Sequence, residues 1–328
     1  MSYLDPRAGQ KSGNDTDASV PHAWHADEAA RPEHLGDVTE PEKKGPGKRR
    51  AGKSKSRAGR NLPAAIAVGV SLVLLVLASL VVWPPAFIGV IVVAACAGAW
   101  EMANALRKTG AKAPLIPLMA GAVVMTALAY YDGADSLVIG LAVTILAALV
   151  WRVADGFGSV RRDFTAILMV AVYVPFLLSF AILLQQPDAD GDGRWRVLCT
   201  LLAVVLSDTG GYASGVFLGR HKMAPSISPG KTWEGFAGSI CASAIGSALL
   251  LYFLLDIPSY WGLLFGAVIS VVAVVGDLAE SMLKRDLGVK DMSNLLPGHG
   301  GVMDRLDSIL FAVPTAYLLF AVISANLL

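Results

Sequence analysis

Long apolar segments alternate with short polar connections along most of the chain, beginning near residue 62. A segment of roughly 20 apolar residues is long enough to cross a bilayer. Because backbone groups in hydrocarbon must be hydrogen-bonded within their own segment, each apolar run is predicted to be a helix. The pattern therefore predicts an all-α polytopic membrane protein with about nine transmembrane helices, at residues 62–83, 86–105, 114–131, 135–152, 164–186, 195–218, 234–255, 260–283 and 305–327.

The first 60 residues have a different pattern, with no apolar run and many Gly, Pro, Ser and charged residues. They contain nine Asp or Glu, followed by nine Lys or Arg between Lys43 and Arg60. Such a segment cannot bury enough apolar surface to offset the entropy of ordering it. Residues 1–60 are predicted to be a disordered, charged cytoplasmic tail, and residues 61–328 to form the transmembrane domain. Because no aromatic residues interleave the basic charges, nucleic acid is not an expected partner.

The cations between the predicted helices indicate the orientation of the chain. With the N-terminus placed in the cytoplasm, only Arg194 and Arg196 fall in outer connections. Such an excess of inner cations is what the positive-inside rule expects, so the predicted location is the cell (inner) membrane with the N-terminus inside. The thirteen inner cations are Arg107, Lys108, Lys112, Arg152, Arg161, Arg162, Arg220, Lys222, Lys231, Lys284, Arg285, Lys290 and Arg305.

Composition adds little beyond this picture. Apolar residues make up 55% of the chain and charged residues 16%, and the net charge of +1 hides the segregated charges of the tail. Cys96, Cys199 and Cys241 all lie in apolar runs, without the spacing of a metal site. They are predicted to be free thiols.

The first polar cluster inside the apolar segments is LSDTGGYASGVFLGRHK, residues 206–222. It places Asp208 within a predicted membrane helix, where a carboxylate is costly unless it faces a cavity, a cation or a partner. Small residues follow it directly. The glycines have a purely structural interpretation, because small residues let membrane helices approach closely.

The second cluster is SISPGKTWEG, residues 226–235, a predicted loop before a helix. Lys231 beside backbone amides at a helix N-terminus suits a phosphate group. Thr232 is also a plausible N-cap with Glu234 in the first turn, and capping explains this segment at least as well as phosphate binding.

The third cluster runs from GDLAESMLKRD at 276–286 to LLPGHGGVMDRLDS at 295–308. Asp277, Glu280 or Ser281, and Lys284 share one helix face at spacings of three or four. The glycines of the turn would let backbone amides approach an anion. Asp304 and Asp307 open the last helix, where acidic residues are stabilising in any case. Together, Asp277 and Asp304 are predicted to hold Mg²⁺, which takes few protein oxygens and leaves positions for phosphates.

The segment SMLKRDLGVKDMSNLLPGHGGVMDRLD, residues 281–307, resembles the sequence motif of the phosphatidate cytidylyltransferase family, also called CDP-diacylglycerol synthases. DTGGY at 208–212 and SPGKTWEG at 228–235 are also similar to segments of that family. The resemblance is strong over residues 205–308, the expected active-site half, moderate over the earlier helices and absent from the tail. Within residues 281–307 it holds at every position that the motif fixes, including Lys284, Arg285, Lys290, Asp291, His299, Gly300, Gly301, Asp304, Arg305 and Asp307.

The resemblance implies transfer of a cytidylyl group from CTP to phosphatidic acid, giving CDP-diacylglycerol and pyrophosphate at a cytoplasmic site. It also implies Mg²⁺, with a second cation that is monovalent such as K⁺. Asp277 and Asp304 would bind metal, and Glu280, Asp307 and Asp208 would be outer ligands or supports. The implied phosphate contacts are Lys231, Lys284, Arg285 and Arg305.

Three further positions in the motif have more than one interpretation. His299 would contact a phosphate, donate a proton to pyrophosphate, or stabilise its turn. Lys290 and Asp291 would form a loop ion pair or contact the nucleotide, and exposed pairs contribute little stability.

Alternatives within and outside this chemistry stay open at the level of sequence. One is a CTP-dependent transferase or kinase acting on another lipid, such as a polyprenol. Another is a cation or proton transporter that uses Asp208, Asp277 and Asp304, since intramembrane acids often line such paths. The expected partners are CTP, phosphatidic acid and membrane lipids. A homodimer is also expected, because segments such as GFAGSICASAIG allow tight helix contact.

Overall fold

A computed structural model describes residues 62–156, 159–186, 193–296 and 300–327. The chain divides into two units, residues 1–55 and 56–328, and the described residues all belong to the second. The predicted disordered tail lies outside the described residues. The elements of the second unit are α1 (Leu62–Val81), α2 (Pro85–Arg107), α3 (Leu115–Tyr131), α4 (Ala134–Ala154), α5 (Val160–Ala171), η1 (Val172–Phe176), α6 (Leu177–Gln185), α7 (Arg194–Leu218), β1 (Lys222–Ala224), β2 (Ser228–Thr232), α8 (Trp233–Leu255), α9 (Ser259–Asp286) and α10 (Met303–Leu327).

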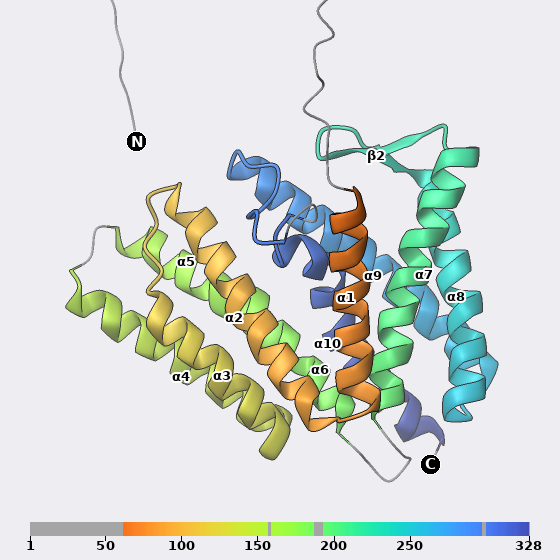
Figure 1. The fold of residues 1–328 in the computed structure, drawn as a ribbon, viewed down its shortest axis with the longest axis horizontal. Helices are drawn as coiled ribbons and strands as arrows, with labels where there is room; N and C mark the ends of the chain where they lie inside the picture. The colour runs from red at the N-terminus through yellow and green to blue at the C-terminus, as the bar shows by residue number, and fades with distance from the viewer. Residues whose placement is uncertain (1–61, 157–158, 187–192, 297–299, 328) are drawn as a thin grey trace, which may run out of the picture. The chain divides into compact units, whose positions relative to one another are not determined.

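Nine helical segments are present in the described ranges if α5, η1 and α6 are counted as one, and all nine predicted apolar segments are helical (Figure 1). Seven of them are long and apolar enough to cross a membrane. The other two, Ile66–Val81 of α1 and Leu115–Tyr131 of α3, are apolar but shorter. The chain is therefore an all-helical membrane protein with seven helices of spanning length, and a count of nine spans stays a prediction.

The segment 160–185 is continuous but not uniform. Its middle, η1, is a π-helical turn that contains Pro175. Proline removes a backbone donor, and a wider turn accommodates the proline ring within a helix. Ser179 donates to the carbonyl oxygen of Pro175 at 2.7 Å, and Tyr173 of the same turn stacks edge-on against Phe311 of α10.

Small residues hold the helices of the second half close together. At Gly210 of α7, an added Cβ would lie 2.8 Å from the carbonyl oxygen of Gly238 in α8. At Gly276 of α9, it would lie 2.6 Å from the carbonyl oxygen of Asp307 in α10. The structural interpretation of these glycines is confirmed, because the backbones approach at distances that leave no room for a side chain.

A two-stranded antiparallel hairpin joins α7 to α8, where the sequence alone predicts a loop. α7 ends and α8 begins at the same end of the bundle, so the connecting chain must run out and return (Figure 1). Its two arms then satisfy each other's backbone groups. The hairpin closes where Trp233 donates to the carbonyl oxygen of His221 at 2.9 Å.

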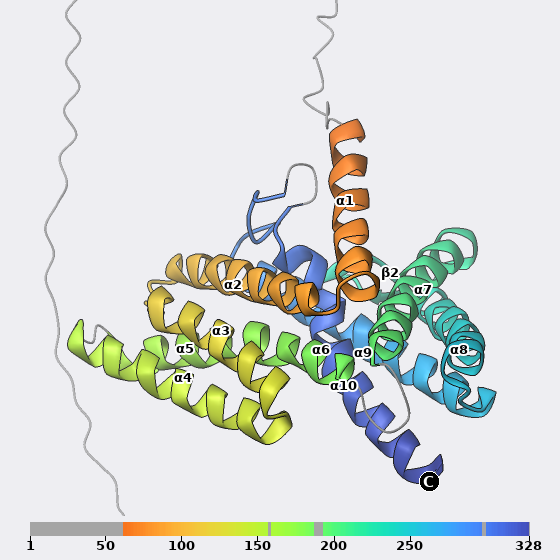
Figure 2. The same ribbon diagram turned by 60° about the horizontal axis from the view of Figure 1, so that its bottom comes forward.

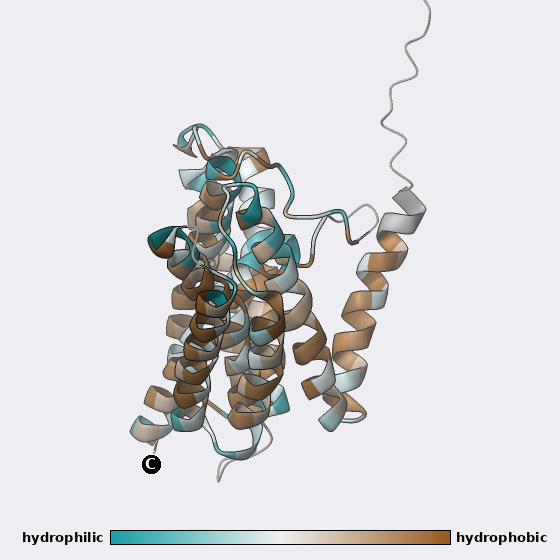
Figure 3. Cartoon of the chain, turned by 90° about the vertical axis from the view of Figure 1, so that its left-hand side faces the viewer, coloured by the Kyte–Doolittle hydropathy of each residue, from teal (hydrophilic) through white to brown (hydrophobic). Residues whose placement is uncertain are grey.

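The surface of the second unit agrees with a lipid environment. Large apolar side chains are exposed along the helices, including Val73 of α1, Leu146 of α4 and Phe253 of α8. Figure 3 shows hydrophilic residues gathered at the end of the bundle that carries the hairpin, with apolar colour along the helix shafts. α1 stands apart from the other helices except near α2 (Figure 2).

Candidate active site

The first polar contact of the predicted site joins the hairpin to α9. Lys231 of β2 places Nζ 2.6 Å from Oδ2 of Asp277, and the same amine lies 3.4 Å from the carbonyl oxygen of Val274. Ser281 donates to the other carboxylate oxygen of Asp277 at 3.3 Å. Thr232 accepts the amide of Gly235 at 3.1 Å and is therefore the N-cap of α8, as predicted. The side chain of Thr232 therefore caps α8, while the side chain of Lys231 contacts Asp277 on α9.

The second contact joins α9 to α10 through one lysine. Lys284 Nζ lies 2.9 Å from Oδ1 of Asp304 and 3.3 Å from Oε1 of Glu280. Glu280 has no exposed surface, and both of its carboxylate oxygens are buried without a hydrogen bond. One cation therefore faces two acids, and the Glu280 carboxylate has lost its water without gaining full compensation.

The turn before α10 fixes the other side of Asp304. Its Oδ2 accepts the amides of Gly301 at 2.8 Å and Met292 at 3.0 Å. Gly300 has a φ of +80°, in the left-handed region that glycine adopts without strain. Asp304 is thus held by two backbone amides and one lysine. The amides of the glycine turn are predicted to approach a bound anion, but the amide of Gly301 binds the carboxylate of Asp304 instead.

Further acids surround these pairs. Electrostatic interaction links Asp208 of α7 to Asp277 and Asp307. Asp307 also interacts with Glu280, and it accepts the amide of Ser308 at 2.7 Å. The linked group thus contains five carboxyl groups but two lysines, and this surplus of acids favours a cation. The five are Asp208, Asp277, Glu280, Asp304 and Asp307.

The remaining predicted residues lie at the edge of this cluster or outside the described chain. Arg285 donates from Nε to the carbonyl oxygen of Ile227 at 3.4 Å, so it reaches the hairpin. Arg305 is exposed. His299 lies outside the described residues. Lys290 and Asp291 are both exposed, and the described chain shows no ion pair between them, so of the two alternatives their contact with the nucleotide stays a prediction.

A model described as the Cytidylyltransferase family matches residues 63–323, most of the chain. The chain belongs to the cytidylyltransferase family. The resemblance seen in residues 281–307 is therefore confirmed.

Individual relatives are similar over much of this cytidylyltransferase. The phosphatidate cytidylyltransferase of Mycobacterium bovis is 38% identical over 281 residues, which cover 82% of this chain and 91% of the relative. That of Mycobacterium leprae is 39% identical over 285 residues, covering 82% and 90%. That of Bacillus subtilis is 40% identical over 159 residues, covering 48% and 58%.

The donor set of this cytidylyltransferase fits a divalent cation that is shared with phosphates. No three His, Cys, Asp or Glu side chains of the described ranges are grouped closely enough to hold a metal alone. Mg²⁺ does not require such a cage, because it commonly takes one or two carboxylates and completes its shell with water and phosphate oxygens. The buried Glu280 oxygens without hydrogen bonds and the surplus of acids both favour a bound cation beside Asp277 and Asp304.

The sequence analysis did not single out Glu101, a residue next to the candidate site of this cytidylyltransferase. Glu101 of α2 is fully buried and contacts the turn that carries Asp304. Its signal was present in GAWEMANAL, because a carboxylate inside an apolar helix is costly and needs a partner, as at Asp208. The predicted active-site half begins at residue 205 and so excludes this helix.

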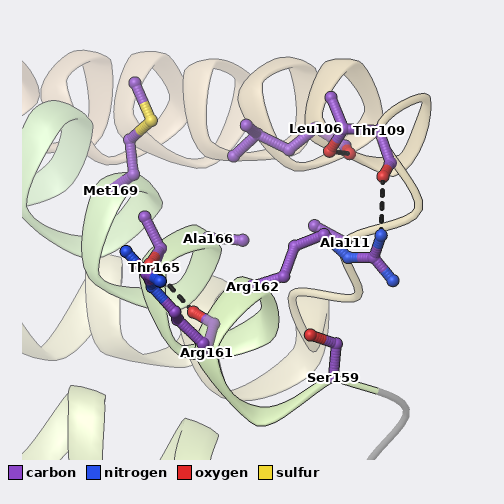
Figure 4. A pocket seen from close by; sticks show the side chains of 9 residues that line it. All are labelled: Leu106, Thr109, Ala111, Ser159, Arg161, Arg162, Thr165, Ala166 and Met169. Atoms are coloured by element: carbon purple, nitrogen blue, oxygen red, sulfur yellow. Dashed lines mark hydrogen bonds between the residues drawn. The ribbon is translucent and has the colours of Figure 1, made fainter. Parts of the chain in front are cut away.

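A separate polar region of the cytidylyltransferase lies where α2 ends and α5 begins. Arg152 donates from Nε and Nη2 to Oδ2 of Asp163, both at 2.9 Å, and Oδ1 accepts the amide of Lys112 at 2.8 Å. A nearby cavity of about 320 Å³ is lined by apolar side chains such as Leu106 and Met169 and by Arg161 and Arg162 (Figure 4). Arg162 there donates to the carbonyl oxygen of Thr109 at 3.2 Å. None of the predicted site residues lines this cavity.

Proposed function

We propose that the protein transfers the cytidylyl group of CTP to phosphatidic acid, forming CDP-diacylglycerol and releasing pyrophosphate. The observation that carries this proposal is the pairing of Lys231 with Asp277 and of Lys284 with Asp304 at one end of apolar helices. Lysines can hold phosphate charge and carboxylates can hold a metal, and both must be present for nucleotidyl transfer. The relatives named phosphatidate cytidylyltransferase support the choice of acceptor.

The reaction requires little covalent chemistry from the protein. A phosphate oxygen of the lipid attacks the α-phosphorus of CTP, and the bond from that phosphorus to the β-phosphate oxygen breaks. The attacking oxygen is already anionic near neutral pH, so neither a strong base nor a protein nucleophile is required. Positioning and charge stabilisation supply most of the catalysis.

Mg²⁺ at Asp277 and Asp304 would neutralise phosphate oxygens of the bound nucleotide. Lys231 and Lys284 hold these two carboxylates in place before substrate arrives. Each lysine can then turn its charge toward a phosphate, because its partner acid gains a new cation. Glu280 and Asp307 support this arrangement from the buried side, and a second, monovalent cation such as K⁺ would offset their charge.

The exposed cations would complete the binding surface for the triphosphate. Arg285 lies beside the hairpin and Arg305 in the first turn of α10, next to the paired acids. Lys290, Asp291 and Gly300, in the connection between α9 and α10, would contribute to the same surface. His299 keeps its three proposed roles.

A transferase or kinase acting on another lipid, such as a polyprenol, would use the same nucleotide site. Acceptor choice depends on the groove for the lipid chain. A transporter would need a path of polar groups through the bilayer, whereas these acids pair with lysines near one end of the helices. Membership of a cytidylyltransferase family favours the enzyme.

The deciding experiment supplies purified protein in detergent with labelled CTP, phosphatidic acid and Mg²⁺. Product is expected from the parent and from Asp135→Asn, an exposed acid at the start of α4. No product is expected from Asp277→Asn or Asp304→Asn, or after chelation of the metal. Turnover of CTP with a polyprenol alone would refute the acceptor, and no turnover with any lipid would refute the reaction.

The orientation and the assembly belong to the same proposal. The N-terminus and the site would face the cytoplasm, which labelling of single cysteines introduced at Lys222 and at Arg194 in intact cells would test. A homodimer is proposed as well, but the backbone of Ser243, in the segment GFAGSICASAIG that suggested it, packs against Gly266 of α9 within one chain. Mass measurement of the detergent complex would test the dimer.

A further inference from the structure

The buried carboxylate of Glu101 is bound by three donors from a distant part of the chain. Ser293 donates its hydroxyl to Oε1 at 2.5 Å, and the amide of Val302 donates to the same oxygen at 2.9 Å. The amide of Met303 donates to Oε2 at 2.8 Å. The donors lie about 200 positions further along the chain, so α2 is tied directly to the start of α10.

This arrangement is a helix cap supplied by another helix. The first amides of an α-helix have no partner within the helix, and a negative charge at that end is favoured by the helix dipole. α10 begins at Met303, and Glu101 accepts the amide of that residue and of the one before it. The cost of burying Glu101 is offset by three hydrogen bonds to its charged form.

Glu101 and Asp304 divide the donors of one turn between them. Gly301 donates to Asp304, while Val302 and Met303 donate to Glu101. In the segment that leads into this turn, the backbone amide of Met292 also donates to the carboxylate of Asp304. The position of Asp304 relative to α2 is therefore fixed through consecutive residues of a turn that Glu101 anchors.

The packing around Glu101 leaves little room for another arrangement. A Cβ at Gly301 would lie 2.5 Å from Oε2 of Glu101. One turn earlier on α2, a Cβ at Gly98 would lie 2.7 Å from Val174 and 3.4 Å from the sulfur of Met303. Glycines at both positions let α2 approach the turn closely enough for the carboxylate to reach its donors.

We propose that Glu101 is a positioning residue for the transfer reaction, acting through Asp304. Its carboxylate holds the turn before α10 so that Asp304 meets Lys284 of α9 and the metal at one place. This inference rests on the proposed function. It also extends the site to α2, in the half of the chain that the sequence motifs leave out.

The test compares Glu101→Gln with a matched buried acid. Gln keeps the shape of Glu101 but turns an amide donor toward groups that donate, so the turn loosens. Asp163→Asn is the control, because Asp163 is also buried and also accepts a backbone amide, but it lies in α5 and contacts Arg152. Product formation is measured over a range of Mg²⁺ concentrations, together with thermal unfolding.

Glu101→Gln is expected to raise the half-saturating Mg²⁺ concentration or lower kcat by about 10-fold to 100-fold, the size of effect seen when the groups that orient a metal ligand are disturbed. Asp163→Asn is expected to lower the unfolding temperature and leave the half-saturating Mg²⁺ concentration unchanged. An unchanged Mg²⁺ profile and kcat in Glu101→Gln would overturn the proposal. Equal changes in both variants would also overturn it, because they would reflect stability alone.

A second measurement does not depend on turnover. Hydrogen exchange at the amides of Val302 and Met303 is expected to be faster in Glu101→Gln than in the parent, and unchanged in Asp163→Asn. If the parent were inactive with every lipid, the proposed function would fail while this measurement still judged the anchoring of the turn. Unchanged exchange at both amides in Glu101→Gln would refute the positioning role.

Discussion

Two buried ion-pair networks lie in different halves of the molecule, and they differ in how completely their charges are matched. In the first, Arg152 faces Asp163, and both carboxylate oxygens of Asp163 accept hydrogen bonds. In the second, Lys284 faces both Asp304 and Glu280, and Glu280 accepts no hydrogen bond. The first network pairs one cation with one acid, whereas the second has two carboxyl groups for one lysine.

A membrane protein gains from closing such a network, because an unmatched buried charge is costly. The Arg152–Asp163 pair therefore needs no ligand to explain it. The incomplete pairing of Glu280, together with Asp307 and Asp208 nearby, would be explained by the proposed cation and phosphates. Incomplete hydrogen bonding of a buried acid thus distinguishes the proposed catalytic cluster from the Arg152–Asp163 pair.

The largest effect is expected from Lys284→Met, which removes the one cation between two acids. Breaking a buried pair by deleting one partner typically costs about 3–5 kcal/mol. Both the unfolding temperature and the product yield should fall sharply, as measured by thermal unfolding and by CDP-diacylglycerol formation. Arg161→Met, which removes an exposed cation of α5, should change neither. A Lys284→Met enzyme with parental stability would show that the second network is not held by this lysine.

Asp163→Asn should destabilise the protein without changing its chemistry. It removes the carboxylate charge that faces the buried guanidinium of Arg152, at a cost of about 3 kcal/mol. Denaturant or thermal unfolding measures that loss, and kcat per folded molecule should remain at the parental value. A change in the half-saturating CTP or Mg²⁺ concentration would instead connect the closed network to the site.

Glu280→Gln should have the opposite signature, with activity lost and stability kept. Lys284 keeps Asp304 as its partner when Glu280 becomes a neutral amide, so stability should stay within about 1 kcal/mol of the parent or rise. Activity should fall about tenfold or more, because the variant loses part of the field that attracts the cation. The same two assays measure both effects, and a stable, fully active variant would remove Glu280 from the site.

The sequence predicted the helices well because their signal is local. Nine apolar runs of near-spanning length mark nine helical segments, and their ends differ from the predicted ends by a few residues. The capping role of Thr232 was also predictable, since an N-cap depends on residues within one turn. The hairpin was not predicted, because its strands are three and five residues long and their pairing depends on where α7 and α8 meet.

Most acids and lysines of the candidate site were singled out from the sequence, but the pairs that they form were not. The helical spacing placed Asp277, Ser281 and Lys284 on one face of α9. The partner of each acid is set by tertiary packing, so the pairing of Asp277 with the hairpin residue Lys231 was not foreseen. Glu101 was overlooked because its contacts lie across the whole chain, although its setting in an apolar helix marked it as unusual.

The smallest effect is expected at Thr232, whose capping role can be compared with the proposed phosphate-binding role of its neighbour Lys231. Thr232→Ala removes the N-cap of α8 and should cost about 1 kcal/mol of stability, with little change in the CTP or Mg²⁺ dependence. Lys231→Met, one residue earlier, should lower activity through loss of the contact with Asp277 and of the proposed phosphate contact, while stability changes less than in Lys284→Met because Lys231 is more exposed. Thermal unfolding and steady-state kinetics of the two variants give the comparison. If Thr232→Ala reduced activity as strongly as Lys231→Met, the cap would be the element that aligns the lysine, and structure and chemistry would not be separable within this hairpin.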